Sequence, residues 1–302
     1  MSIPLFDCHC DTAVRVWLTG RSLRENSLHL DLRRLKKFSP AAQVFAVCTE
    51  ALEDPQVKAA AVIRYFKEQI EMNSDIVKLC LNSHDIVSTM AGGKIAALLS
   101  VEGAEQIDDI EMAYALGVRV VHITWNFDNG LCGSVMGSGA GLSEKGRCFV
   151  KKAQELGVLL DTSHISQQGF WEVLEIIRKP VIAGHSNTRA LCPVPRNLSD
   201  EQFIALKNQG GGAGINLYPE FLGLGRDIDA VFAHIEHFMA LGGEKAVFLG
   251  CDLDGIDEMP KGIHGVEDLG KIYEVLLRHN YPESLVRDVF INNIMNIMER
   301  VL

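Results

Sequence analysis

The sequence predicts a (β/α)₈ barrel that forms a single domain over residues 1–302. Three observations lead to this fold class. Short apolar runs recur along the chain, amphipathic segments separate them, and polar residues gather at one end of the runs. Eight strands that alternate with helices over about 250 residues are the pattern of this barrel. A doubly wound open sheet is the alternative architecture.

The apolar runs are rich in β-branched residues and nearly continuous, which is typical of parallel strands that are buried on both faces. In chain order, we expect strands at 5–10, 43–49, 95–101, 119–125, 158–164, 181–185, 212–217 and 246–251.

The segments between the strands have helical spacing. In the clearest one, Val62, Phe66 and Ile70 recur at every fourth position, which predicts a helix over 57–81. Gly157 is a stop signal for the helix before it. Further helices are expected at 143–156, 167–177, 200–208, 228–241 and 266–278.

Composition and charge exclude several classes of protein. An apolar fraction of 47% and a charged fraction of 23% are ordinary for a soluble globular enzyme. The net charge of −10 argues against nucleic acid or an anionic membrane surface as the main partner. We see no signal peptide and no apolar run long enough to span a bilayer. The eight cysteines include no C-x-x-C pair, so we expect reduced core residues and a cytoplasmic protein.

Histidines and carboxylates end five of the eight predicted strands at the same end. This is the end at which barrels of this kind carry their active sites. One buried histidine is usually a core residue, but random placement would not gather five such cases at one end. The candidate metal ligands are His9, Asp11, Glu102, His164 and His185.

Three imidazoles and two carboxylates fit zinc or a similar divalent ion. Five protein ligands exceed the three of a typical catalytic zinc and suit two ions that share a carboxylate. We expect Glu102 to bridge them, because its strand lies between the two groups of ligands.

The stretch FDCHCDT also contains two cysteines that could bind metal. On a strand, side chains alternate between the two faces. Asp7, His9 and Asp11 should then share one face, with Cys8 and Cys10 directed outward into the layer between strands and helices. We therefore assign the cysteines to packing.

Asp252 is the candidate general base, because a carboxylate beside a metal-bound water can accept its proton. Asp254 is the alternative, and either residue could instead cap a turn before Gly255. The glycine-rich stretches at 137–141 and 210–214 do not have the pattern of a phosphate-binding loop.

The motifs resemble the renal (membrane) dipeptidase family of the amidohydrolase superfamily, in family order and over nearly the whole chain. The matching pieces are DCHCDT at 7–12, SVEGA at 100–104, GLSEKGR at 141–147, GVLLDTSHIS at 157–166, GHSNTRAL at 184–191, PRNLSDEQ at 195–202, LGCDLDGI at 249–256 and HNYPESLVRDVFINN at 279–293.

The resemblance implies a zinc-dependent dipeptidase with two zinc ions per chain and a dipeptide substrate, often with a D-amino acid or glycine in the second position. It implies that His9 and Asp11 hold one zinc and His164 and His185 the other, with Glu102 as the bridge. It also implies that Asp252 is the base, that Arg196 holds the substrate carboxylate, that Tyr218 lies near the substrate, and that the protein is a homodimer. The alternatives are another amide, lactam or ester hydrolase on the same metals, and a metal-free binding protein.

One position departs from the animal members, which carry a histidine after the fourth strand that stabilises the oxyanion. Trp125 stands there in this chain. Asn126 or a zinc ion could take over this role. His122 is expected inside the strand and not in the site.

Overall fold

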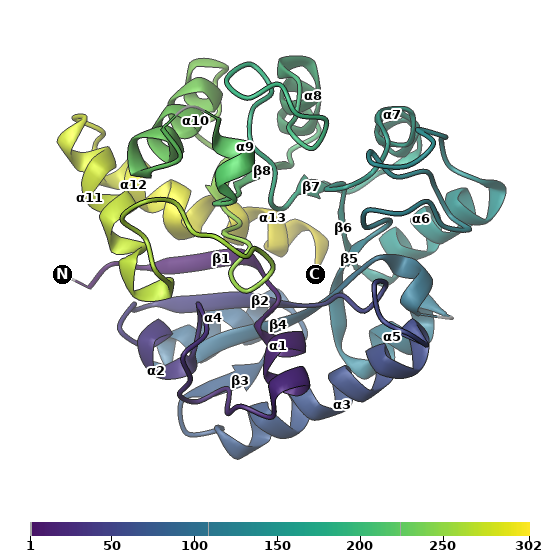
Figure 1. Ribbon diagram of the computed structural model, residues 1–302, viewed down its shortest axis with the longest axis horizontal. Coiled ribbons are helices and arrows are strands. Elements are labelled where there is room, and N and C mark those ends of the chain that lie inside the picture. The colour runs from purple at the N-terminus through teal and green to yellow at the C-terminus, as the bar shows by residue number, and fades with distance from the viewer. Residues whose placement is uncertain (1, 108, 224) are drawn as a thin grey trace.

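The computed structural model describes residues 2–107, 109–223 and 225–302. Within these ranges, eight parallel strands close into a barrel, because β1 pairs with both β2 and β9 and β2 pairs with β4 (Figure 1). This confirms the predicted fold class. The barrel strands are β1 (Leu5–Cys10), β2 (Ala41–Val47), β4 (Ile95–Glu102), β5 (Val118–His122), β6 (Leu159–Asp161), β7 (Ile182–Ala183), β8 (Gly212–Ile215) and β9 (Val247–Leu249).

Most of these strands end a few residues earlier than predicted. His164 and His185 therefore lie in the loops just beyond β6 and β7, and Asp252 lies beyond β9. The backbone of His164 and that of Asp252 are left-handed, with φ of 68° and 60°. Such a conformation is uncommon outside glycine and is concentrated at functional sites.

The predicted helix at 57–81 is wrong over its last nine residues. Helix α3 (Pro55–Met72) ends at Asn73, whose side chain donates a hydrogen bond to the Gln69 carbonyl. The chain then forms a ninth strand, β3 (Val77–Leu79), which pairs with the beginning of β4. Helical spacing in the sequence could not reveal this pairing, because it depends on a partner that lies farther along the chain.

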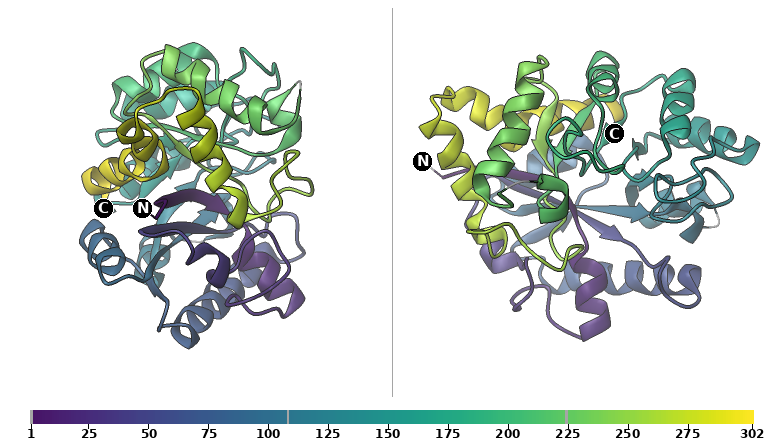
Figure 2. Two further views of the ribbon diagram at one scale, coloured as in Figure 1. Left: turned by 90° about the vertical axis from the view of Figure 1, so that its left-hand side faces the viewer. Right: turned by 45° about the horizontal axis from the view of Figure 1, so that its top comes forward.

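The helices cover the outside of the barrel (Figures 1 and 2). The other predicted helices are present within a few residues, and α6 begins after Ser143, whose hydroxyl accepts a hydrogen bond from the Gly146 amide. The larger helices besides α3 are α1 (Thr12–Thr19), α4 (Ser83–Ala91), α5 (Ile110–Leu116), α6 (Glu144–Leu156), α7 (Gln167–Ile176), α8 (Asp200–Asn208), α10 (Ile228–Ala240), α11 (Gly270–Arg278) and α13 (Asn293–Val301). The short ones are α2 (Leu32–Leu35), η1 (Ala104–Gln106), α9 (Pro219–Leu222), η2 (Val266–Asp268), α12 (Glu283–Arg287) and η3 (Asp288–Asn292).

The apolar side chains form two cores. The larger core joins the outer strand faces to the helices. The smaller core collects side chains from β1, β2, β4, β5, β6, β7 and β9, which only the barrel interior can bring together. Ile294 and Met298 of α13 also belong to this core and close the barrel at the N-terminal ends of its strands. The N-terminal mouth of the barrel is thus filled, and the opposite mouth is left for the site.

Strand β1 does not alternate as predicted. Asp7 pairs with Gln43 and Cys10 with Phe45, so β1 has one residue more than β2 between these pairs, which is a β-bulge. Cys8 joins the inner core and Cys10 the outer one. The predicted outward direction is therefore wrong for Cys8, and the bulge explains how the adjacent His9 can also reach the interior.

No helix in the described parts of the chain combines the length and the apolar character that crossing a bilayer requires.

Candidate metal centre and active site

The five predicted metal ligands converge on Glu102. Its Oε1 atom lies 3.0 Å from Nε2 of His164 and 3.2 Å from Nε2 of His185. Its Oε2 atom lies 3.5 Å from Nε2 of His9, which is 3.4 Å from Oδ2 of Asp11. Each oxygen of Glu102 thus faces one of the two predicted pairs, as a bridging carboxylate would require.

The cluster is buried, and several of its polar atoms lack ordinary hydrogen-bond partners. Both ring nitrogens of His9 and Nδ1 of His185 make no hydrogen bond with any residue that the structure describes. Buried polar atoms without partners are rare in native proteins and call for an explanation. Unpartnered imidazoles around a shared carboxylate fit a divalent metal, so the donor set suits the zinc that the motifs imply.

The charges in the cluster favour a cation. Burial, reinforced by the Arg196 guanidinium, lowers the pKa of His164 to about 3, which keeps this imidazole in the neutral form that binds metals. Burial alone would also lower the pKa of His9, but the carboxylates of Glu102 and Asp11 raise it well above its usual value. The surroundings of His9 therefore stabilise positive charge at this point.

A second histidine–carboxylate pair lies beside the cluster and was not predicted. Nε2 of His122 lies 2.9 Å from Oδ2 of Asp161, and both side chains are fully buried. The His122 ring meets the rings of His9 and His185 edge-on, with centroids 5.0 and 5.3 Å away. His122 lies in β5, as expected, but it is the last residue of this strand and borders the site, which was not expected. Its position directly before the end of a strand was the only signal in the sequence.

Asp252 and Asp254 are clearly distinguished by their contacts. Both oxygens of Asp254 accept hydrogen bonds, from the Thr12 hydroxyl at 2.6 Å and from the His29 amide at 2.7 Å. Asp252 accepts one at Oδ2 from Asn216, while its Oδ1 atom lies 3.8 Å from Nε2 of His9. Burial, with smaller contributions from neighbouring carboxylates, raises the pKa of Asp252 to about 6. Asp252 is the better placed of the two to exchange a proton near the cluster.

Arg196 is a buried cation with unused donors. One nitrogen donates to the Ser186 hydroxyl at 3.1 Å and another to the His185 carbonyl at 3.3 Å, so neither hydrogen bond is to a carboxylate. Its Nε atom has no partner within the described chain. A guanidinium offers five N–H donors, and a buried charge normally requires a counterion. Arg196 is therefore suited to bind an anionic group.

Asn126 and Tyr218 border the site in different ways. Oδ1 of Asn126 lies 2.9 Å from Nδ1 of His164, so Asn126 orients this imidazole, and only its amide nitrogen could meet a substrate oxygen. The backbone amide of Tyr218 donates to Oδ1 of Asn216 at 2.6 Å. The ring of Tyr218 faces the cavity beside the ring of Phe221.

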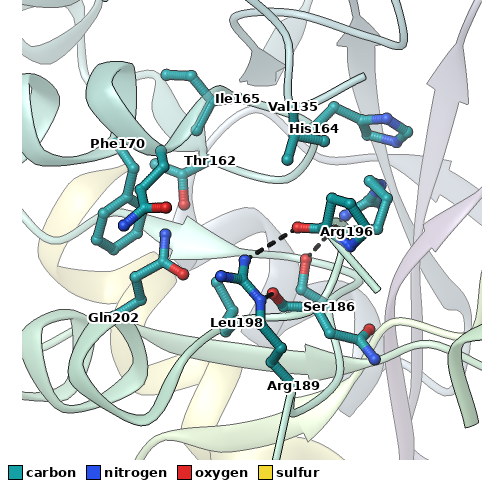
Figure 3. Close-up of a pocket in the computed structure, with 13 residues that line it drawn as sticks. Val135, Thr162, His164, Ile165, Phe170, Ser186, Arg189, Arg196, Leu198 and Gln202 are labelled. Atoms are coloured by element: carbon teal, nitrogen blue, oxygen red, sulfur yellow. Dashed lines mark hydrogen bonds between the residues drawn. The ribbon is translucent and has the colours of Figure 1, made fainter. Parts of the chain in front are cut away.

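A cavity of about 320 Å³ opens above the cluster. Its lining includes Asp11, Glu102, Trp125, Asn126, His164, Arg196, Tyr218 and Asp252. A much smaller cavity of about 20 Å³ lies on the other side of Arg196. Figure 3 shows it with Phe170 and Gln202 on one side and His164, Arg196 and Ser186 on the other.

The chain belongs to the membrane dipeptidase family (peptidase family M19), whose family model matches residues 1–302. It is accordingly a metallo-dipeptidase, a hydrolase that acts on peptide bonds. An uncharacterized dipeptidase of Schizosaccharomyces pombe is 29% identical in an alignment of 310 positions that covers 91% of this chain and 73% of that protein.

Two solved structures agree with this assignment. The dipeptidase AC, a metallopeptidase of the same family, has a TM-score of 0.90 and 28% identity over 100% of this chain and 99% of its own. A metallopeptidase from Rhodobacter sphaeroides, solved with a phosphinate mimic of the dipeptide L-Ala-D-Ala, has a TM-score of 0.89 and 27% identity over the full length of both chains.

Proposed function

We propose that this family member uses two zinc ions per chain to hydrolyse small free dipeptides, including those with a D-amino acid or glycine in the C-terminal position. The observation that carries this proposal is Arg196, a buried guanidinium without a carboxylate partner among its hydrogen bonds. It lies on the wall of the cavity that Asp11, Glu102 and His164 of the cluster also line. The ligand of the Rhodobacter sphaeroides relative supports the D-residue.

His9 and Asp11 would hold one zinc, His164 and His185 the other, and Glu102 both. Bound zinc polarises a carbonyl oxygen and lowers the pKa of water. Arg196 binds the substrate carboxylate through two parallel N–H donors, a geometry that suits guanidinium and carboxylate. Because this carboxylate is anchored, the distance to the scissile amide selects dipeptides over longer peptides.

Asp252 moves the proton. Its Oδ1 atom, which Asn216 leaves free, takes a proton from the attacking water as the new C–O bond forms. The same carboxyl group then delivers that proton to the leaving nitrogen as the C–N bond breaks. One water is consumed, and two amino acids are released.

A substrate panel tests this function. We expect zinc-loaded protein to hydrolyse L-L, L-D and L-Gly dipeptides, and their C-terminal amides at least tenfold less efficiently, because the amides lack the charge that Arg196 binds. Protein freed of metal by a chelator should be inactive and should recover with zinc. Equal activity on dipeptides and amides, or activity confined to lactams or esters, would favour another hydrolase on the same metals.

We propose the reducing cytoplasm as the compartment, on the grounds that all eight cysteines carry free thiols.

A further inference from the structure

Cys48 reaches the proposed metal centre from β2, a strand that carries none of the predicted ligands. It directly follows β2, and its Sγ atom lies within 4.8 Å of a carboxylate oxygen of Asp11 and of one of Glu102, and these two oxygens also lie within 4.8 Å of each other. The residue carries a free thiol, is partly exposed and lines the cavity of about 320 Å³.

A second observation points to a ligand at the same place. His9 is completely buried, neither of its ring nitrogens has a hydrogen-bond partner in the described chain, and Nε2 is aimed at the same two carboxylates at 3.4 and 3.5 Å. An imidazole and a thiol thus approach Asp11 and Glu102 from the ends of β1 and β2. The ligand atoms of Cys48, Asp11 and Glu102 form one group within 4.8 Å, and Nε2 of His9 lies close to each of the two carboxylates. Ligand atoms that share a tetrahedral zinc, each about 2.0–2.3 Å from the ion, are separated by similar distances.

We propose that Cys48 is an additional ligand, through its sulfur, of the ion that His9, Asp11 and Glu102 would hold. The inference rests on the proposed zinc centre and deepens it. On binding, the thiol proton leaves to solvent and the sulfur joins one nitrogen and two oxygen donors.

The added sulfur makes the two halves of the centre chemically different. The half with His9, Asp11, Glu102 and Cys48 has four protein donors, one of them soft, and the half with His164, His185 and Glu102 has three donors and no sulfur. Thiolate favours zinc, cobalt and cadmium, whereas carboxylate and water suit magnesium and manganese. Cys48 should therefore bias the first half towards soft or borderline ions. The second half has fewer protein donors and so leaves a position on its ion open to the substrate.

Cobalt substitution provides the test without measuring activity. Metal-free full-length protein is loaded with two equivalents of Co²⁺, and we expect a near-ultraviolet sulfur-to-cobalt charge-transfer band that corresponds to one thiolate per chain. Cys48→Ser should lose this band and keep the visible cobalt bands that arise from the other ligands. Cys148→Ser, which changes an exposed thiol on α6, is the matched control and should keep both.

Two further measurements use the same proteins. In competition titrations, Cys48→Ser should weaken Cd²⁺ binding by about 10-fold to 100-fold and Mn²⁺ binding by much less. In the unmutated protein, bound zinc should slow alkylation of Cys48 by iodoacetamide at least tenfold, as followed by peptide mass spectrometry.

A charge-transfer band that persists in Cys48→Ser, or its absence from unmutated protein that holds two cobalt ions, would overturn the ligand assignment. Unmutated protein that holds two cobalt ions and hydrolyses dipeptides without the band would leave the proposed function standing. Protein that binds no cobalt would contradict both proposals.

Discussion

Asn216 donates a hydrogen bond of 2.9 Å from Nδ2 to Oδ2 of Asp252, and this bond decides which oxygen of the proposed base is free. The Asn216 amide group is itself held in place. Its Oδ1 atom accepts from the Tyr218 backbone at 2.6 Å, and its Nδ2 atom also reaches the His185 carbonyl at 3.3 Å. The loop after β8 thus orients the carboxylate that follows β9.

Asp252→Asn should lower kcat by roughly 10²-fold to 10⁴-fold, the usual contribution of a positioned acid–base group, and leave the zinc content at that of the unmutated protein. Steady-state kinetics and inductively coupled plasma mass spectrometry measure the two quantities. Asp257→Asn is the control, because Asp257 lines the same cavity but is exposed. A variant with near-normal kcat would exclude Asp252 as the base.

Asn216→Ala should lower kcat by roughly tenfold to a hundredfold through misorientation of Asp252, with little change in KM. If Asn216 acts through Asp252, adding Asn216→Ala to Asp252→Asn should cost almost nothing further, because the effects of residues that work as a unit are not additive. Independent losses that multiply in the double variant would instead mean that Asn216 has a separate role.

Arg196→Met should raise KM for free dipeptides strongly and change kcat/KM for the corresponding C-terminal amides much less, because only the free dipeptides lose a charge pair. Both substrates are measured on one protein preparation, so a folding defect would affect them alike. Equal losses on a dipeptide and on its amide would rule out carboxylate recognition by Arg196.

His9→Ala should remove at least one zinc per chain, whereas Cys8→Ala and Cys10→Ala should retain both ions. Because Cys8 packs in the inner core and Cys10 in the outer one, each cysteine variant should unfold at a lower urea concentration. Zinc analysis of the folded variants checks the assignment, which would fail if Cys8→Ala lost zinc and His9→Ala kept it.

His234 should make the protein less stable in mild acid. Its Nδ1 atom accepts a hydrogen bond from the Thr188 amide at 3.2 Å, and Nε2 lies 3.2 Å from the Leu222 carbonyl, so the ring is neutral. Burial lowers the pKa of His234 to about 4, although the Leu222 carbonyl opposes this. An unfolded histidine has a pKa of about 6.5, so between this pH and pH 4 the unfolded chain binds a proton that the folded chain does not. The free energy of unfolding therefore falls as the pH is lowered through this range, by about 3 kcal/mol in total.

The test for His234 compares urea unfolding at pH 7 and pH 4.5. His234→Asn, whose Oδ1 atom could replace Nδ1 as the acceptor, should be less stable at pH 7 but should lose clearly less stability between the two pH values. His84→Asn, at an exposed position, should behave like the unmutated protein. An unchanged pH dependence in His234→Asn would contradict the assignment.

The sequence by itself determined the barrel and pointed to candidate residues that lie close together at one mouth of it. Apolar runs and helical spacing are local properties, and His9, Glu102 and His185 could be recognised because each stands at or just beyond the end of such a run. Parallel strands in a closed barrel end at one mouth, so residues far apart in the chain could be placed together before any contact was known.

Only the tertiary structure decided the features that depend on how two distant segments pair. The bulge in β1 exists only relative to β2, and it directed Cys8 inward against the expected alternation. The strand β3 exists only because the start of β4 offers it a partner. Likewise, Cys48 and Asn216 have no local signature, and His122 has only its place at the end of a strand. Their neighbours Asp11, Asp252 and Asp161 are 36 or more positions away in the chain and are brought close only when the barrel closes.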